Sequence, residues 1–192
     1  MKSRLWILAA VAALAAGCAQ VTKVATGEVM LRERMTVTTA TTWNQFERGL
    51  GNDTPTWTQE GLTVDALQFI VAIKDGDLIA PTPSEPKGTR PLAFKATMQP
   101  AEIAKLYETL WTRDGSQYTL DRLAPETFAG QPGFRVEYSL VRKSDDVRLR
   151  GMAVGAVKDG QLFMIHYAAP RMAFFPRYQV QVESLIKTAR LR

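Results

Sequence analysis

Few side chains in this sequence have the types needed for chemistry, and a single histidine is the first of them. His166 lies in an alternating apolar stretch, 162–168, and is the only histidine in 192 residues. Histidine transfers protons readily near neutral pH, so His166 is a candidate general base or proton switch. The other interpretation, which we favour, is a half-buried strand residue that makes one hydrogen bond. No G-x-S-x-G sequence accompanies it, and spacing identifies no serine or aspartate partner.

Carboxylate pairs occur in two predicted turns, at Asp75 and Asp77 and at Asp145 and Asp146. Such pairs can bind a cation, but aspartate is also frequent in turns because its side chain bonds the local backbone, and we favour this second explanation. One cysteine and one histidine exclude a zinc finger, an iron–sulfur cluster and a cysteine–histidine nucleophilic pair in the folded part. We therefore expect no metal, no cofactor and no catalytic residue.

Four basic side chains near one turn form the third candidate feature. Arg142 and Lys143 precede the turn at 144–146, and Arg148 and Arg150 follow it. Two strands joined by this turn would place the four cations close together, as a candidate patch for lipid headgroups, an anionic polymer or an acidic partner. The alternative, which we favour, is a solvated edge strand that its charge protects from aggregation.

The lone cysteine follows a segment of the export type. A basic stub precedes an apolar run over 5–16, and Gly17 and Cys18 come next. A bilayer span needs about 20 apolar residues, so this run is too short for a lasting span and is typical of a cleaved signal peptide. Residues 14–18, LAAGC, resemble the lipobox of bacterial lipoproteins, whose cysteine is acylated and becomes the first mature residue. The alternative is an ordinary secretory signal in which Cys18 is incidental.

A lipoprotein assignment implies a location and a set of partners. Acyl chains on Cys18 would hold the mature protein on a membrane, since two or more chains give persistent anchoring. Residue 19 is alanine rather than aspartate, which favours the periplasmic face of the outer membrane in a Gram-negative cell. The net charge of +5 is compatible with nucleic-acid binding, but export separates the chain from nucleic acid. The expected partners are the membrane, through Cys18, and an envelope protein or anionic envelope polymer.

Periodicity divides the chain into three parts. Residues 1–17 are the predicted signal peptide, and 18–33 show no clear period and are expected to form a lipidated tether. The remaining 34–192 are enough for a single globular domain with one core. Helices are predicted from Pro100 to the Asp-Gly sequence that follows, and over about 175–189, because apolar residues recur there three and four positions apart.

Alternating or β-branched runs predict the strands of this domain. They are 35–42, 62–73, 78–80, 118–123, 134–141, 147–157 and 161–168. The last three follow one another through tight turns, which predicts an antiparallel meander. Four prolines between residues 81 and 91 predict a surface loop with polyproline character, which we expect to be a solvated connector rather than a binding loop.

The order of glycine and aromatic residues in the second half resembles a known superfamily. The residues concerned are F-x-G-x-x-G-F at 128–134, G-x-x-x-G at 151–155, Asp159-Gly160, F-x-I-x-Y-x-A-P at 163–170 and Phe174-Phe175. This series resembles the superfamily of the photosystem II subunit PsbP, the Ran-binding Mog proteins and the bacterial DcrB-like lipoproteins. The resemblance implies an α+β fold, an α/β/α sandwich around a central, mainly antiparallel sheet. It implies binding or assembly roles more than catalysis, because the matched positions are structural.

Two functional hypotheses follow. The first, which we favour, is a lipid-anchored cell-envelope lipoprotein that acts as a non-catalytic binding or assembly-accessory module. The second is an envelope hydrolase whose carboxylate or hydroxyl site is not visible from spacing. A buried carboxylate facing His166 across a pocket would favour the hydrolase, whereas a shallow surface without convergent polar groups would favour the binding module.

Overall fold

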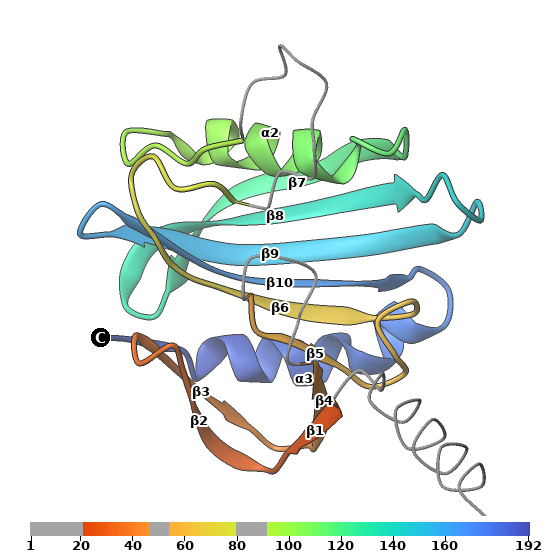
Figure 1. Ribbon diagram of the computed structural model, residues 1–192, viewed down its shortest axis with the longest axis horizontal. Helices are drawn as coiled ribbons and strands as arrows, with labels where there is room; N and C mark the ends of the chain where they lie inside the picture. Colours follow the sequence, from red (N-terminus) through yellow and green to blue (C-terminus); the bar gives the residue numbers. More distant parts are fainter. Residues whose placement is uncertain (1–20, 47–53, 80–91) are drawn as a thin grey trace, which may run out of the picture.

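One large antiparallel sheet organises the computed structural model, which describes residues 21–46, 54–79 and 92–192. Its strands are β1 (Val21–Val24), β4 (Trp43–Phe46), β5 (Thr56–Thr58), β6 (Ala66–Ile73), β7 (Gln117–Phe128), β8 (Gln131–Val141), β9 (Arg148–Lys158) and β10 (Gln161–Pro170). They lie in the order β1-β4-β5-β6-β10-β9-β8-β7 (Figure 1). Each neighbouring pair is antiparallel. The predicted C-terminal meander is therefore confirmed.

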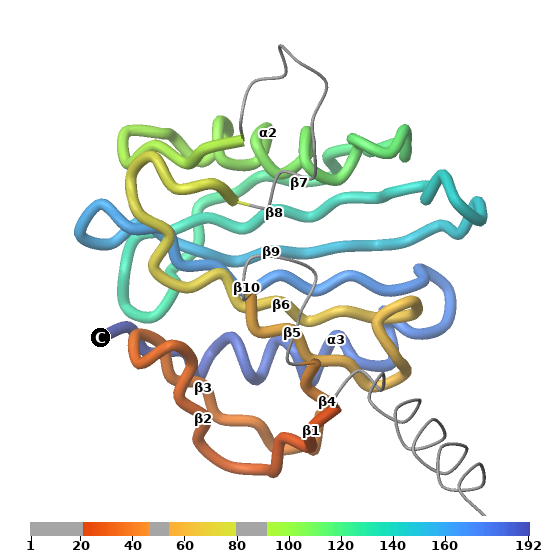
Figure 2. Tube along the Cα trace, viewed as in Figure 1, coloured from red at the N-terminus to blue at the C-terminus, as the bar shows by residue number. Residues whose placement is uncertain are grey.

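Two helices pack on opposite faces of the sheet. They are α2 (Pro100–Trp111) and α3 (Phe174–Lys187), which Figure 1 shows on opposite sides of the molecule. A smaller sheet of β2 (Gly27–Leu31), β3 (Met35–Thr39) and β11 (Arg190–Leu191) lies beside α3, as the trace in Figure 2 also shows. This arrangement confirms the predicted α+β class with helices on both sides of a mainly antiparallel sheet.

Alternation along the central strands separates the buried residues into two cores. Ala153 and Met164 belong to the core beneath α2, whereas their neighbours Val154 and Ile165 belong to the core beneath α3. Successive side chains of a strand point to opposite faces of the sheet, so each central strand contributes to both cores. Both faces of these strands are buried, which explains their nearly continuous apolar sequence.

Helix α2 begins and packs as its sequence predicts. Pro100 occupies the first turn, where its missing N–H costs little, and the Glu102 carboxylate accepts the Gln99 backbone N–H at 2.7 Å. The apolar positions Ile103 and Tyr107 are buried against the sheet. This stripe fixes which face of α2 covers the sheet, and it brings Trp111, one turn further on, over the same surface.

The N-terminal strands differ from the prediction. Residues 18–33 were expected to form a tether, but β1 and β2 lie within that range and pair with β4 and β3. Val24 and Leu31 are buried in the core beneath α3. Strands of four or five residues are too short for a visible local period, so their partners rather than their own sequence define them.

Two further boundaries are corrected. The strand predicted over 62–73 begins only at Ala66, because a turn closed by the Asp65 carboxylate precedes it. The short strand expected at 78–80 is a single bridge between Leu78 and Ala93. Within the described ranges, no helix combines the length and apolar character required to cross a membrane.

Candidate functional site

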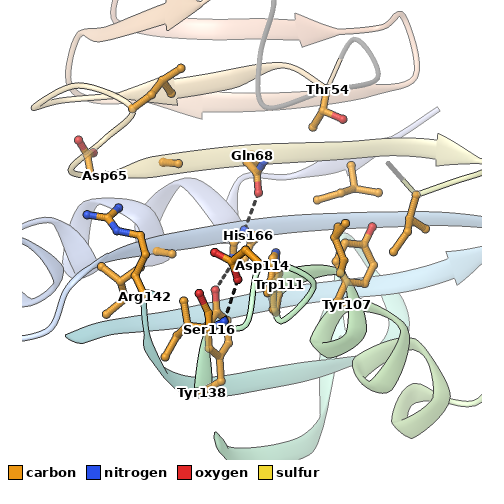
Figure 3. Close-up of a pocket in the computed structure, with 18 of the residues that line it drawn as sticks. Thr54, Asp65, Gln68, Tyr107, Trp111, Asp114, Ser116, Tyr138, Arg142 and His166 are labelled. Carbon is orange, nitrogen blue, oxygen red and sulfur yellow. Dashed lines mark hydrogen bonds between the residues drawn. The ribbon is translucent and has the colours of Figure 1, made fainter. Parts of the chain in front are cut away.

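A cavity of about 350 Å³ lies between α2 and the sheet. Figure 3 shows its lining, which comes mainly from β6, β8, β9 and β10, from α2 and the residues after it, and from the loop before β6. The aliphatic part of the wall consists of Leu62, Val64, Ala66, Ile70, Ile79, Leu110, Leu140, Leu149 and Ala168. A volume above 300 Å³ and a mainly apolar wall with a few polar groups are typical of small-molecule sites. The cavity is therefore the candidate functional site.

His166 lies in the wall of this cavity, joined to two neutral side chains. Its Nε2 is 2.7 Å from the Tyr138 hydroxyl, and its Nδ1 is 2.8 Å from Gln68 Oε1 (Figure 3). The side chain is almost fully buried, with 3% of its surface exposed. The expected strand residue with one hydrogen bond is thus corrected: His166 is fully buried, and both ring nitrogens are bonded.

Burial makes His166 a poor base. It lowers the pKa of the imidazole from its usual value near 6.5 to about 3, and it raises the pKa of the Tyr138 phenol well above its ordinary value. The phenol therefore keeps its proton and donates to Nε2, while Nδ1–H donates to Gln68. In this tautomer, which is assigned from the hydrogen bonds, the Tyr138 hydroxyl proton and the Nδ1 proton of His166 each have an acceptor. The imidazole is neutral and held in place.

Strand β9 lies between β8 and β10 and creates the space for this contact. Gly151 of β9 is opposite Tyr138, and a methyl group at position 151 would overlap with the Tyr138 ring. The ring therefore lies over the glycine and reaches across to His166. Trp111 of α2 then covers both rings, stacked on Tyr138 at 4.6 Å and on His166 at 4.5 Å between ring centroids.

The carboxylates of the cavity wall serve local turns, and the serine hydroxyl bonds the backbone of a turn that is distant in sequence. Asp65 is 1% exposed and accepts the Thr58 hydroxyl at 2.5 Å and the Glu60 backbone N–H at 2.8 Å. Asp114 accepts the Ser116 backbone N–H at 2.8 Å, and Ser116 Oγ accepts the Lys143 backbone N–H at 3.0 Å. No hydrogen bond between a carboxylate and His166 occurs in the described part of the chain.

Among the comparisons with known proteins, the search of solved structures supports the fold, and the other searches do not contribute. The search of protein-family models finds no match, and neither does the search of curated proteins. The solution structure of cyanobacterial PsbP (CyanoP) from Synechocystis sp. PCC 6803 matches with a TM-score of 0.58 and 11% identity, over 93% of this chain and 96% of that one. The fold is PsbP-like. At this identity the similarity concerns the fold only.

A second solved structure is similar to a smaller degree. It is the crystal structure of LpqN, involved in cell envelope biogenesis of Mycobacterium tuberculosis, with a TM-score of 0.35 and 10% identity over 92% of this chain and 87% of that one. A similarity of this degree supports no argument about this chain. The fold therefore rests on the PsbP comparison, and the function on the residues themselves.

The PsbP-like fold separates the four cations that the sequence places around one turn. Arg142 lines the cavity, where it is paired with Asp145 at 2.6 Å and donates to the Thr63 carbonyl at 2.9 Å. Arg150 lies on the α3 side, over the Phe175 ring at 5.2 Å and 3.0 Å from Glu137.

Arg148 and Lys143 are both exposed. Arg148 shares the α3 side with Arg150, because residues two apart on a strand point to the same face. Arg142 thus lies on the other side of the sheet from Arg148 and Arg150, and an interaction patch formed by the four cations stays a prediction.

Two other predictions fall outside the described residues. They concern Cys18 with its signal peptide, 1–17, and the proline-rich segment 81–91. Asp77 accepts the nearby Lys74 backbone N–H, as expected for a turn, whereas Asp75 accepts the backbone N–H of Ala96, which is 21 positions away. Across the described ranges, no group of three or more His, Cys, Asp or Glu side chains is placed to hold a metal ion.

Sequence reasoning missed the residues that surround His166. Gln68 is directly opposite His166 on the neighbouring strand, a pairing between segments almost a hundred positions apart. Trp111 follows the apolar spacing of α2, but nothing in the sequence indicated that its ring covers a histidine. One available signal was Gly151, since a glycine in a strand often marks the close approach of a bulky neighbour.

Proposed function

We propose that this chain is a lipid-anchored protein of the cell envelope, and that its folded domain is a non-catalytic binding module with the cavity as its binding site. The anchor rests on the sequence pattern that ends at Cys18. The binding role rests on one observation: the cavity is mainly apolar, and the group in it best suited to acid–base chemistry is a buried histidine bonded to Tyr138 and Gln68.

The chemistry of the wall supports binding over hydrolysis. A hydrolytic histidine needs a nearby hydroxyl or water to deprotonate and usually a carboxylate that orients it. Both nitrogens of His166 are instead occupied by neutral partners, and Asp65 and Ser116 are committed to turns. An envelope hydrolase is the alternative, and the experiment below separates the two.

The test is recovery of a bound molecule. The purified full-length chain is incubated with an extract of the envelope of its own cells, and bound compounds are identified by mass spectrometry. We expect a compound recovered chemically unchanged, by the wild type and by His166→Gln. Ala168→Leu, which fills the cavity, should abolish recovery, whereas Ala101→Leu on the exposed face of α2 should not. A compound that the wild type consumes and His166→Gln does not would support the hydrolase and contradict the proposal.

The anchor has its own test. Cys18→Ser removes the only thiol of the chain, so it should abolish incorporation of a fatty-acid analogue during growth and block maturation at this site. His166→Gln provides a control in which the thiol is intact. Equal labelling of Cys18→Ser and the wild type would contradict the lipoprotein assignment, without affecting the binding role of the cavity.

A further inference from the structure

The chemistry of the cavity wall restricts the molecule that it can accept. We infer that the cavity takes an aliphatic molecule that carries an uncharged oxygen able to accept a hydrogen bond, such as an ester, ketone or ether oxygen. This inference rests on the proposed binding function and names the ligand class for the same site.

The shape and lining of the cavity favour an aliphatic body. Ala66, Gln68 and Ile70 share one face of β6 and border the cavity, so it extends along the strand for about 13 Å at about 3.3 Å per residue. Seven of the other sixteen lining residues are leucine, isoleucine, valine or alanine. Trp111 already stacks on two rings, Tyr138 and His166. A flexible hydrocarbon therefore matches this wall better than a planar aromatic molecule does.

Two side chains that line the cavity have a hydrogen-bond donor that is not already used. The Tyr107 side chain is 5% exposed, and its hydroxyl has no hydrogen-bond partner among the described residues. Figure 3 shows this hydroxyl turned from α2 toward β6, within the lining of the cavity. Gln68 uses its oxygen on His166, and its amide nitrogen makes no hydrogen bond in the described part of the chain. A buried donor without a partner is costly, so the Tyr107 hydroxyl favours a ligand with an acceptor oxygen, to which the half-buried Gln68 amide can also donate.

The charges around the cavity favour an uncharged ligand. Arg142, the one cation among the described residues that line it, already binds the Asp145 carboxylate through two nitrogens, at 2.9 and 2.6 Å. His166 is neutral, and Asp65 and Asp114 add negative rather than positive charge to the wall. A carboxylate in this apolar space would lose its hydration without gaining a free cation, which is unfavourable.

Three probes of similar size test the inference: methyl octanoate, octanoate and nonane. Binding to the mature chain, from which Trp6 is removed with the signal peptide, is followed by intrinsic fluorescence, since Trp111 lines the cavity whereas Trp43 and Trp57 lie in the other core. We expect methyl octanoate to bind more tightly than either of the other probes. Tyr107→Phe should weaken binding of the ester about fivefold, the effect of one hydrogen bond, and leave nonane unchanged.

Tyr167→Phe is the matched control. Its hydroxyl is also buried without a partner among the described residues, but it lies in the core beneath α3. It should leave the affinities for all three probes unchanged. Ala168→Leu should weaken binding of the ester and of nonane together, which keeps the test decisive if Tyr107→Phe fails to fold.

Several outcomes would overturn the inference. They are ester binding no tighter than nonane binding, octanoate binding tighter than the ester, and an equal loss for ester and nonane in Tyr107→Phe. If none of the three probes binds but a different compound is recovered from the envelope extract, the ligand class is wrong and the proposed binding function stands. If the extract also yields nothing, the proposed function fails with it.

Discussion

Strand β8 carries two buried polar clusters, one on each face of the sheet, and they differ in charge. Tyr138 faces α2 and forms a neutral cluster with His166 and Gln68. Arg135, three positions earlier, faces α3 and binds the carboxylates of Glu126 and Glu183, the latter at 2.8 Å through two nitrogens. The first cluster borders the cavity, and the second ties β7 and β8 to α3.

Access to water explains this difference. The side chains of Glu126 and Glu183 are 31% and 25% exposed, and Arg135 hydrogen-bonds both of them. Its hydrogen bond lowers the pKa of Glu126, and the two carboxylates raise the pKa of Arg135. His166 has almost no exposure and no charged partner, so it is neutral. A charge is stable at the rim of the sheet where water and counter-charges reach it, and a neutral group is stable at the centre.

The largest effect is expected from breaking the charged cluster. Arg135→Met leaves Glu126 and Glu183 without their cation, so it should lower the free energy of unfolding by about 3 kcal/mol. Guanidinium unfolding measures this loss. Arg148→Met, on the same side but exposed, should change stability by no more than about 0.5 kcal/mol. Equal losses of unfolding free energy in the two variants would contradict a stabilising role for the buried Arg135.

A smaller loss should follow from crowding the neutral cluster. Gly151→Ala places a methyl group against the Tyr138 ring and should cost about 2 kcal/mol, within the usual range for overpacking. A smaller side chain at position 138 should relieve the overlap. The double variant Tyr138→Leu with Gly151→Ala should therefore lose less stability than the sum of the single variants. Strict additivity would contradict the contact.

The pH dependence of stability separates the two clusters. In the unfolded chain a histidine takes up a proton near pH 6.5, whereas the pKa of folded His166 is about 3. Between these values the unfolded state binds more protons, so His166 makes the fold less stable as the pH falls from about 6.5 toward 3, by about 1 kcal/mol per pH unit.

His166→Gln removes this proton uptake. Its free energy of unfolding should therefore fall less between pH 6.5 and 4.5 than that of the wild type, although it should be lower by about 1 kcal/mol at pH 7.5. Urea unfolding at a series of pH values measures both effects. Parallel stability curves for the two proteins would contradict a buried neutral histidine.

The sequence alone determined the elements that depend on neighbours along the chain. Helix α2 follows from Pro100 and the spacing of its apolar residues, and the meander of β8, β9 and β10 follows from alternation and turn residues. These signals are local, so they are visible without knowing the fold. The resemblance to PsbP, carried by glycines and aromatic residues of the same segments, also pointed to the fold that the comparison supports.

The tertiary structure decided the chemistry of the site. Gln68, His166 and Tyr138 lie on three strands that are distant in sequence, and only strand register brings them into contact across Gly151. Strand pairing also turned Arg142 to the α2 side and Arg150 to the α3 side. The spacing of residues along the chain does not show which strands pair or how deeply a side chain is buried. These two quantities decide whether a histidine is a base or a neutral part of a wall.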